Sequence, residues 1–233
     1  MPLPEIVTPT YTLTVPSSKK KIKYRPFLVK EQKTLIIAME SQDQEQILDA
    51  IKTILSNCIL TAKVKIEDMA LFDIEYIFLQ VRARSISEEI EMKVRCPDDG
   101  ETEVNISFMV DDVKVFFPKG HKNVLKLTDD ITLEMKYPNL EYFTKVNFAK
   151  EKVDAYDLVA QCIKRVYVGT EDSGEFTFKE ARDWVEGLTN AQFSMIQKFF
   201  NTMPTLRHTL KVTNPKTKKV NEIKIEGLAD FFA

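Results

Sequence analysis

The sequence predicts an α+β fold, in which layers of helices pack on small, mostly antiparallel sheets built from hairpins. Apolar residues recur at helical spacing in several segments, most clearly over 47–59, where they form a single stripe. Over 89–96 and 102–108, charged and apolar residues alternate instead, as in strands with one buried face. Hydrophobic residues make up 44% of the 233 residues and charged residues 29%, which is typical of a chain that folds.

The first predicted element is a hairpin. Tyr11–Val15 alternates and is rich in residues that favour strands, and Ile22–Tyr24 follows after a turn that begins with Pro-Ser-Ser. Four lysines lie in or after this turn: Lys19, Lys20, Lys21 and Lys23. They could bind phosphate, but a turn and the outer face of one strand explain them better. We therefore interpret them as a solvated face.

Three helices are predicted after this hairpin. Pro26 keeps the residue before it extended, so the first helix begins near Leu28. Its apolar residues cover more than one side, which predicts a central, largely buried helix. Ser41 or Asp43 caps the second helix, and the third runs over about 67–84.

The strongest hairpin prediction lies in the middle of the chain. The alternating segments 89–96 and 102–108 flank an Asp-Gly pair, which favours a tight reversal. The Cys96-Pro-x-x-Gly sequence also resembles half of a zinc-ribbon knuckle, but Asp99 stands where the second thiolate should be. Because one thiolate cannot hold a metal ion, no metal site is predicted. Two further strands complete a small sheet: Val113–Phe117 and Ile131–Tyr137.

The last part of the chain is predicted to combine helices with a second hairpin. A short helix is expected over about 140–148, and a longer one over 153–168, where Gly169 ends it. Two capping boxes, Thr177-Phe-Lys-Glu180 and Thr189-Asn-Ala-Gln192, open two more helices. The final hairpin consists of the strands 209–213 and 222–226.

These elements group into three regions, which together form one or two compact domains. The N-terminal hairpin and three helices occupy 1–88, the middle sheet region occupies 89–138, and the last helices with the C-terminal hairpin and an aromatic tail occupy 139–233.

The composition argues against several classes of function. Only six glycines are present, so no phosphate-cradling loop or dinucleotide motif can be assembled, and we predict no cofactor and no catalytic residues. Of the two histidines, His121 lies in a polar loop where nothing nearby in the sequence orients it. The three cysteines are far apart and odd in number, which predicts free thiols in place of a disulfide framework.

Charge and hydropathy limit the partners. The formal net charge of −2 and the isoelectric point near 5.9 give no basic field for nonspecific nucleic-acid binding. Apolar runs are far shorter than the roughly 20 residues that a membrane span needs. The sequence starts without the basic and apolar regions of a signal peptide, so we expect a cytosolic protein.

Several motifs in order along the chain resemble a known family. They are Tyr24-Arg-Pro-Phe-Leu-Val-Lys-Glu31 with 35–41, Phe72-Asp-Ile-Glu-Tyr-Ile-Phe78, Val81-Arg-Ala-Arg-Ser85, Phe199-Phe-Asn-Thr-Met-Pro204 and Gly227-Leu-Ala-Asp-Phe-Phe232. Together they resemble the baseplate hub subunits of T-even-type contractile-tailed bacteriophages. The resemblance implies a phage protein without catalysis or cofactor, made in the host cytoplasm. It also implies a subunit or chaperone-like factor of baseplate hub assembly that binds other hub and tail proteins. Such a protein either stays in the virion baseplate or acts only during assembly, and it could also form a homo-oligomer.

Candidate partner-binding residues come from the two ends of the chain. Arg25, Lys30 and Glu31 are required by no packing argument, and Leu228, Phe231 and Phe232 form an aromatic end that either closes the chain's own core or docks into a partner. Two alternatives stay open. One is a divalent-metal-dependent hydrolase that uses Asp98, Asp99, Asp111 and Asp112. The other is a nucleic-acid-associated factor that uses Lys19 to Arg25 and Lys216 to Lys219.

Overall fold

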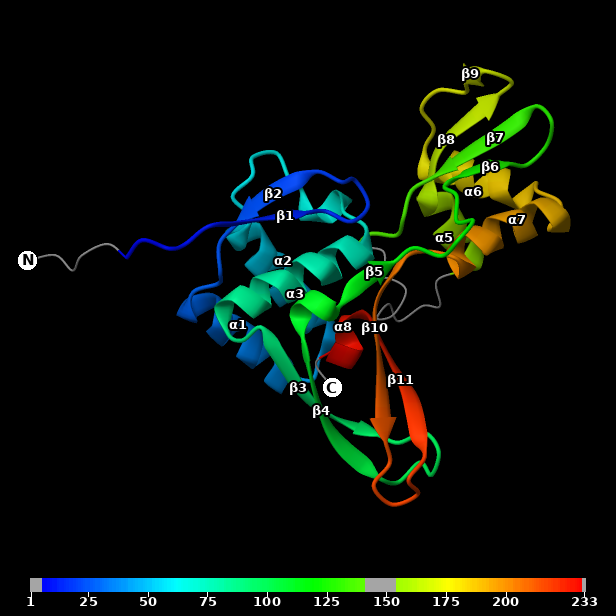
Figure 1. The fold of residues 1–233 in the computed structure, drawn as a ribbon. Coiled ribbons are helices and arrows are strands. Elements are labelled where there is room, and N and C mark those ends of the chain that lie inside the picture. Colours follow the sequence, from blue (N-terminus) through cyan, green and yellow to red (C-terminus); the bar gives the residue numbers. More distant parts are fainter. Residues whose placement is uncertain (1–5, 141–153, 232–233) are drawn as a thin grey trace, which may run out of the picture. The chain divides into compact units, whose positions relative to one another are not determined.

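The structure, a computed structural model, describes residues 6–140 and 154–231. Helices and small antiparallel sheets share the chain, which confirms the predicted α+β fold (Figure 1). The chain forms two compact units. The first holds Met1–Ile66, Phe72–Phe116 and Thr205–Ala233, and the second holds Glu67–Leu71 and Phe117–Pro204. The first unit is therefore built from both ends of the sequence, and most of the second is inserted between them.

A hairpin and three helices form the N-terminal part of the first unit. Tyr11 pairs with Tyr24 and Leu13 with Ile22, as the alternation predicts. Asp43 caps the second helix, since its carboxylate accepts hydrogen bonds from two amides of the first turn. The elements are β1 (Tyr11–Thr14), β2 (Lys21–Tyr24), α1 (Val29–Glu40), α2 (Gln44–Cys58), a 3₁₀ turn η1 (Ile66–Asp68) and α3 (Leu71–Ser85).

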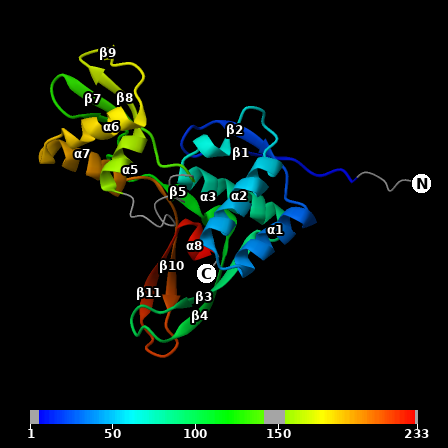
Figure 2. The same cartoon turned by 180° about the vertical axis from the view of Figure 1, so that it is seen from behind.

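Two long hairpins form the other part of the first unit, and we call them the arm (Figures 1 and 2). They are β3–β4, which pairs over its whole length, and β10–β11, which pairs from Arg207 to Thr213 of β10. Inward side chains of both hairpins pack with Leu79 of α3 and with Phe231 in one buried cluster. The elements are β3 (Glu89–Arg95), β4 (Glu103–Met109), a 3₁₀ turn η2 (Val110–Asp112), β5 (Lys114–Phe116), β10 (Thr205–Thr213), β11 (Val220–Glu226) and α8 (Gly227–Phe231). The strand β5 pairs with the start of β10.

The second unit is a four-stranded antiparallel sheet with helices. Its strands lie in the order β6-β7-β8-β9, and Leu133, Met135, Val185, Ile196 and Phe199 are among its buried residues. Both predicted capping boxes are present and open α6 and α7. The elements are β6 (Val124–Lys126), β7 (Ile131–Met135), α5 (Ala155–Cys162), β8 (Ile163–Val168), β9 (Glu171–Asp172), α6 (Phe178–Glu186) and α7 (Asn190–Asn201).

The long helix predicted over 153–168 is wrong in its second half. The helix α5 ends at Cys162, and Ile163–Val168 continues directly as β8, which pairs with β7. Three of these six residues are β-branched, and edge-to-edge pairing with β7 overrides their helical spacing. Gly169, with φ of 61°, ends a strand where we predicted the end of a helix. The short helix predicted over 140–148 lies outside the described residues after Leu140.

Candidate partner-binding surface

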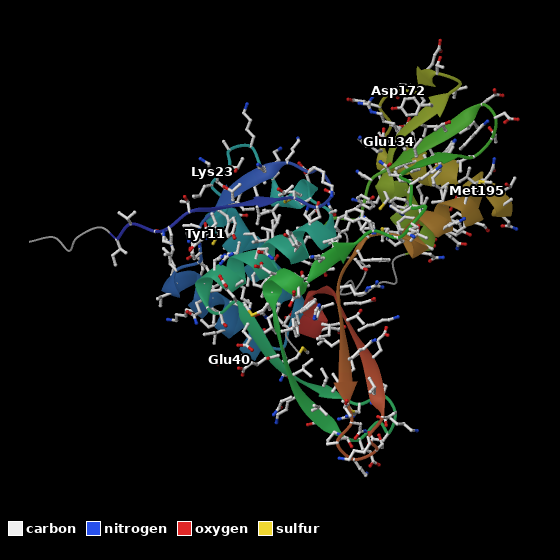
Figure 3. The ribbon with its side chains drawn as sticks, viewed as in Figure 1. Tyr11, Lys23, Glu40, Glu134, Asp172 and Met195 are labelled. Carbon is white, nitrogen blue, oxygen red and sulfur yellow. The ribbon has the colours of Figure 1, made fainter. Side chains whose placement is uncertain are left out.

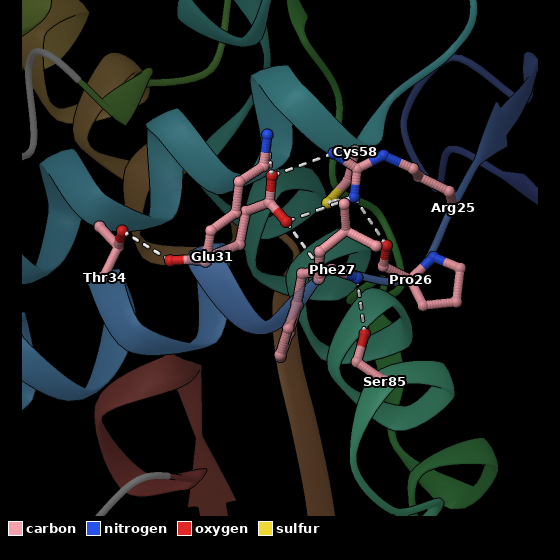
Figure 4. A network of polar contacts seen from close by, with 9 residues as sticks. Arg25, Pro26, Phe27, Glu31, Thr34, Cys58 and Ser85 are labelled. Carbon is pink, nitrogen blue, oxygen red and sulfur yellow. Dashed lines mark hydrogen bonds and ion pairs between the residues drawn. The ribbon is translucent and has the colours of Figure 1, made fainter. Parts of the chain in front are cut away.

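The first helix begins at a leucine, which cannot cap it. Leu28 has the extended backbone of an N-cap residue, but its side chain has no acceptor atom. Glu31, three residues on, reaches back instead, and its Oε2 accepts a hydrogen bond from Leu28 N at 2.6 Å. Phe27 N, just before, donates to Ser85 Oγ at the end of α3 at 2.9 Å. The start of α1 is thus fixed by one of its own carboxylates and by a residue of α3 (Figure 4).

Glu31 is held by a mostly buried ion pair with Arg25. Arg25 Nη2 lies 3.0 Å from Glu31 Oε1, and the side chains are only 14% and 3% exposed. Arg25 Nη1 also donates to Pro26 O at 2.8 Å and approaches Cys58 Sγ at 3.7 Å. Burial alone would raise the pKa of Glu31, but the hydrogen bonds from Arg25 and Leu28 outweigh it and lower that pKa. The expectation that packing does not require Arg25 and Glu31 is therefore wrong; their role in partner binding stays a prediction.

The helix α1 presents apolar side chains to solvent, contrary to the predicted central position. Its buried residues are Glu31, Leu35 and Ala38, which lie on one narrow side. On the opposite side, Val29 is 81% and Ile37 54% exposed. The other exposed side chains of α1 include Lys30, Lys33, Ile36, Met39 and Glu40. Glu40, the last residue of the helix, is labelled in Figure 3. We call Val29, Ile36, Ile37 and Met39 the outer face of α1, and such an exposed apolar row is typical of a binding surface.

The predicted aromatic end of the chain divides into a described and an undescribed part. Phe231 is buried in the first unit, and its ring lies edge-on to Phe108 at a centroid distance of 6.1 Å. Of the two roles considered for the aromatic end, Phe231 therefore has the first: it packs in the chain's own core. Phe232 and the side chain of Leu228 lie outside what the structure describes.

The four aspartates of the hydrolase alternative do not form one site. Asp98 and Asp99 lie at the tip of the arm, where both accept side-chain hydrogen bonds from Asn214. Asp111 and Asp112 are exposed in η2 at the other end of β4. Within the described ranges, no three His, Cys, Asp or Glu side chains are close enough together to hold a metal ion.

The two basic segments of the nucleic-acid alternative belong to different hairpins. Lys23 is exposed on β2, on the N-terminal hairpin (Figure 3). Lys216 lies in the turn between β10 and β11 and pairs with Glu101 at 3.3 Å. Figures 1 and 2 both show these hairpins at opposite ends of the first unit, so the two segments do not form one basic surface.

Both histidines contact residues that are far away in sequence. His121 is oriented, contrary to expectation: its Nδ1 lies 3.0 Å from Thr202 Oγ1 and its Nε2 lies 3.0 Å from Tyr137 Oη. Because Thr202 Oγ1 donates to Lys198 O, it accepts from His121 Nδ1–H, and Nε2 accepts from Tyr137. Burial lowers the pKa of His121. His208 stacks on Phe108 with a ring-centroid distance of 4.6 Å.

The three cysteines are free thiols, as the sequence predicts, and all three are buried. Burial raises the pKa of Cys58 to about 11 and that of Cys162 to about 12. Neither thiol therefore supplies a thiolate nucleophile near neutral pH.

A comparison with known families shows which family the chain belongs to. The sequence profile described as "T4 bacteriophage base plate protein" matches residues 8–233, nearly the whole chain. The chain belongs to the T4 bacteriophage base plate protein family. This membership confirms the resemblance to T4-type baseplate proteins, and other phage tail proteins are the partners that it indicates. No similar protein was found among curated sequences, and none among solved structures.

The family indicates a structural protein of the virion tail baseplate. In the described part of this baseplate protein, no helix has the length and apolar character needed to cross a bilayer. The residues that the sequence singled out for binding fall into two groups: Lys30 is 71% exposed, whereas Arg25, Glu31 and Phe231 are inside. The outer face of α1 was missed because its apolar spacing was taken as a sign of burial.

Proposed function

We propose that the protein is a non-enzymatic subunit or chaperone-like factor of baseplate hub assembly, acting in the host cytoplasm through protein–protein contacts. The observation that carries this proposal is the outer face of α1. Val29, Ile36, Ile37 and Met39 are exposed on a helix whose start is rigidly held by the Arg25–Glu31 pair. A preorganised apolar row loses little conformational entropy on binding, which favours its use as a contact surface.

The outer face of α1 is favoured over the C-terminal end as the first contact. Phe231 is 4% exposed, so a partner would reach it only if α8 left its position against Phe108. Lys30, in contrast, lies next to Val29 of the outer face, and although its Nζ is 3.7 Å from Glu31 Oε1, its side chain is 71% exposed and can meet an acidic residue at the rim of an interface. Arg25 and Glu31 contribute to binding indirectly, by holding α1 in place.

Within the described residues, the side chains named for either alternative function are not brought together in one site. The carboxylates of Asp98 and Asp99 already accept hydrogen bonds from neighbouring side chains, which a divalent ion would have to displace. Calorimetry with magnesium, manganese, calcium and zinc tests the hydrolase, and salt-dependent retention on DNA tests the nucleic-acid factor. Binding of a metal ion at micromolar affinity would reverse our ranking.

Co-expression with neighbouring tail proteins tests the proposed function. The tagged chain is captured, and the mass of the captured complex gives partner and stoichiometry together. We expect a discrete complex with at least one hub or tail protein. Capture of the chain alone from every combination would contradict the proposal. A chain with Val168→Glu, an equally apolar and exposed position on β8, is the matched control for changes on α1.

A further inference from the structure

The two hairpins of the arm turn in the same way at their tips. One turn begins at Cys96 and the other at Asn214, and in both a proline comes second. The fifth residue of each takes a left-handed conformation, with φ of 68° at Gly100 and 63° at Lys218. Its amide donates to the carbonyl of the first residue at 2.9 Å in both turns. The same backbone turn is therefore present twice, in two unrelated sequences.

This turn corresponds to the spacing of a zinc knuckle. In structural zinc sites of the ribbon type, cysteines stand three residues apart in each of two turns, and the four thiolates surround one ion. The corresponding positions here are Cys96 and Asp99 in one turn and Asn214 and Thr217 in the other. Only one of the four is a thiol, so the metal-binding chemistry is missing while both turns are retained.

Side-chain hydrogen bonds join the two tips. Asn214 Nδ2 donates to Asp98 Oδ1 at 2.9 Å and to Asp99 Oδ2 at 3.0 Å. Asn214 Oδ1 accepts from the amides of Lys216 and Thr217 at 2.8 and 3.2 Å. Asn214 is fully buried, and these four bonds use both donors and both lone pairs of its amide. Asn214 therefore closes its own turn and binds the opposite turn at once.

Asn221 and Thr217 add hydrogen bonds between the two turns, and we call this set of bonds the joint of the arm. Asn221 Nδ2 donates to Asp98 Oδ1 at 2.9 Å, and Asp98 N donates back to Asn221 Oδ1 at 3.1 Å. The hydroxyl of Thr217 donates to the other oxygen of Asp98. Cys96 is fully buried next to the network. Hydrogen bonds to ionised carboxylates are about twice as strong as neutral ones, so they suit a joint between two hairpins.

The hairpin β1–β2 shows that the turn alone does not make such a joint. Its turn has a proline after Val15, and Lys19 has φ of 57° and donates to Val15 O. There, Ser17 N donates at 2.9 Å to Asp73 of α3, and no second turn faces it among the described contacts. What distinguishes the arm is that two such turns meet and share carboxylates and amides.

We propose that the tip of the arm is a metal-free counterpart of a two-knuckle zinc site, in which the Asn214 network holds the two hairpins together in the place of the ion. A structural zinc ion stabilises small hairpins by linking them, at the cost of making the fold depend on metal. The Asn214 network links the same two turns without that dependence. One ligand position of each turn, Asp99 and Asn214, is in direct contact with the other at 3.0 Å, so we expect that the four-ligand site can be restored.

Restoring the missing ligands tests this proposal. We expect the variant Asp99→Cys/Asn214→Cys/Thr217→Cys, which keeps Cys96, to bind one cobalt or zinc ion per chain. Cobalt should give the visible absorption bands of a tetrahedral thiolate site, and zinc should raise the melting temperature of the variant. The natural chain should show neither effect and should be unchanged by a chelator.

Adding Cys96→Ser to the triple variant is the matched control, because it leaves only three thiolates. We expect its metal affinity to fall by more than about tenfold, because loss of even an outer partner of a ligand costs roughly 10- to 100-fold. A triple variant that folds by circular dichroism but takes up no cobalt would overturn the proposal, because the four positions would then not converge.

A second variant keeps the proposal testable if the triple variant does not fold. Asn214→Ala in the natural chain removes the joint, so amide exchange should become faster in the opposite turn, at Asp98, Glu101 and Thr102. Asn105→Ala, at an exposed position of β4, is the control and should leave these rates unchanged. Acceleration confined to Lys216 and Thr217 would show that Asn214 serves only its own turn, and would contradict the proposal.

Discussion

At the residue scale, the start of α1 depends on a single carboxylate. Leu28 provides no side-chain cap, but Glu31 accepts a hydrogen bond from the Leu28 amide, and it neutralises Arg25 in a nearly buried position. An ion pair in this setting adds little net stability compared with apolar residues, but removal of one member leaves the other charge buried without a partner.

We therefore predict that Glu31→Ala is strongly destabilising. Arg25 loses its counter-ion and Leu28 N loses its acceptor, so the free energy of unfolding should fall by about 3 kcal/mol. Urea denaturation measures this loss. Lys30→Ala is the control, because Lys30 is 71% exposed, and it should change stability by less than about 0.5 kcal/mol. Equal midpoints for both variants would refute the structural role of Glu31.

A second prediction concerns the buried carboxylate of Asp73, which accepts hydrogen bonds from the amide and hydroxyl of Ser17. Burial raises the pKa of Asp73, although the bonds from Ser17 oppose this. A pKa raised in the folded state gives a stability contribution that is complete below the unfolded pKa, near 3.9, and is lost as pH rises through the folded pKa.

Asp73→Asn removes this titration while an amide can still bond to Ser17. The variant should therefore gain stability relative to the natural chain as pH rises from about 4 to neutrality. Melting temperatures of the two chains over this range give the difference. A difference that is constant with pH would mean that Asp73 keeps an ordinary pKa in the folded protein.

The residue scale also shows what the sequence could not predict. Arg25 and Glu31 were singled out, but as surface residues, because Ser85 and Cys58 come from other helices and enter only through the fold. His121 was taken as unoriented for the same reason, since Thr202 is 81 residues away. The neighbouring sequence of a polar residue does not show which distant residues its side chain will contact.

At the element scale, helix starts were the most predictable features. The hydroxyls of Thr177 and Thr189 each accept a hydrogen bond from the amide three residues on. The side chains of Glu180 and Gln192 in turn accept from the amides of these threonines. Both capping boxes could be found because all their atoms lie within four consecutive residues. The same holds for Asp43 at the start of α2.

We predict that Thr177→Ala costs about 1 kcal/mol of stability, because the amide of Glu180 loses its acceptor. Thermal or urea unfolding of the full chain measures the change. Ser194→Ala, in the interior of α7, removes a hydroxyl that bonds only to a helix carbonyl and should be close to neutral. If the two substitutions cost the same, capping at Thr177 is not what stabilises the start of α6.

The elements that sequence reasoning missed are those that depend on a neighbour. The segment 163–168 has apolar residues at positions that suit a helix, and only its pairing with β7 makes it a strand. The outer face of α1 was predicted to be buried because apolar spacing does not tell which side of a helix meets the core. Asn214 escaped notice although its Asn-Pro turn repeats the spacing of the Cys-Pro turn, which was a usable signal.

At the scale of the whole molecule, the α+β fold and the family could both be predicted from the sequence. The order of motifs from Tyr24 to Phe232 indicated a T4-type baseplate protein, and the family match over 8–233 agrees. The assembly of one compact unit from both ends of the chain could not be read from local patterns, because it rests on contacts such as β5 with β10, about 90 residues apart in sequence. The same long-range packing leaves one face of α1 exposed.

The central claim is that this exposed face binds another baseplate protein, and its most direct test is the affinity of the captured partner. Val29→Glu/Ile37→Glu places two charges on the outer face of α1 without touching its buried side. With unchanged circular dichroism, the variant should bind the partner at least about 30-fold more weakly, equivalent to about 2 kcal/mol, as for a central interface residue. The Val168→Glu control should bind like the natural chain. Equal affinity of the α1 variant and the natural chain would contradict the claim.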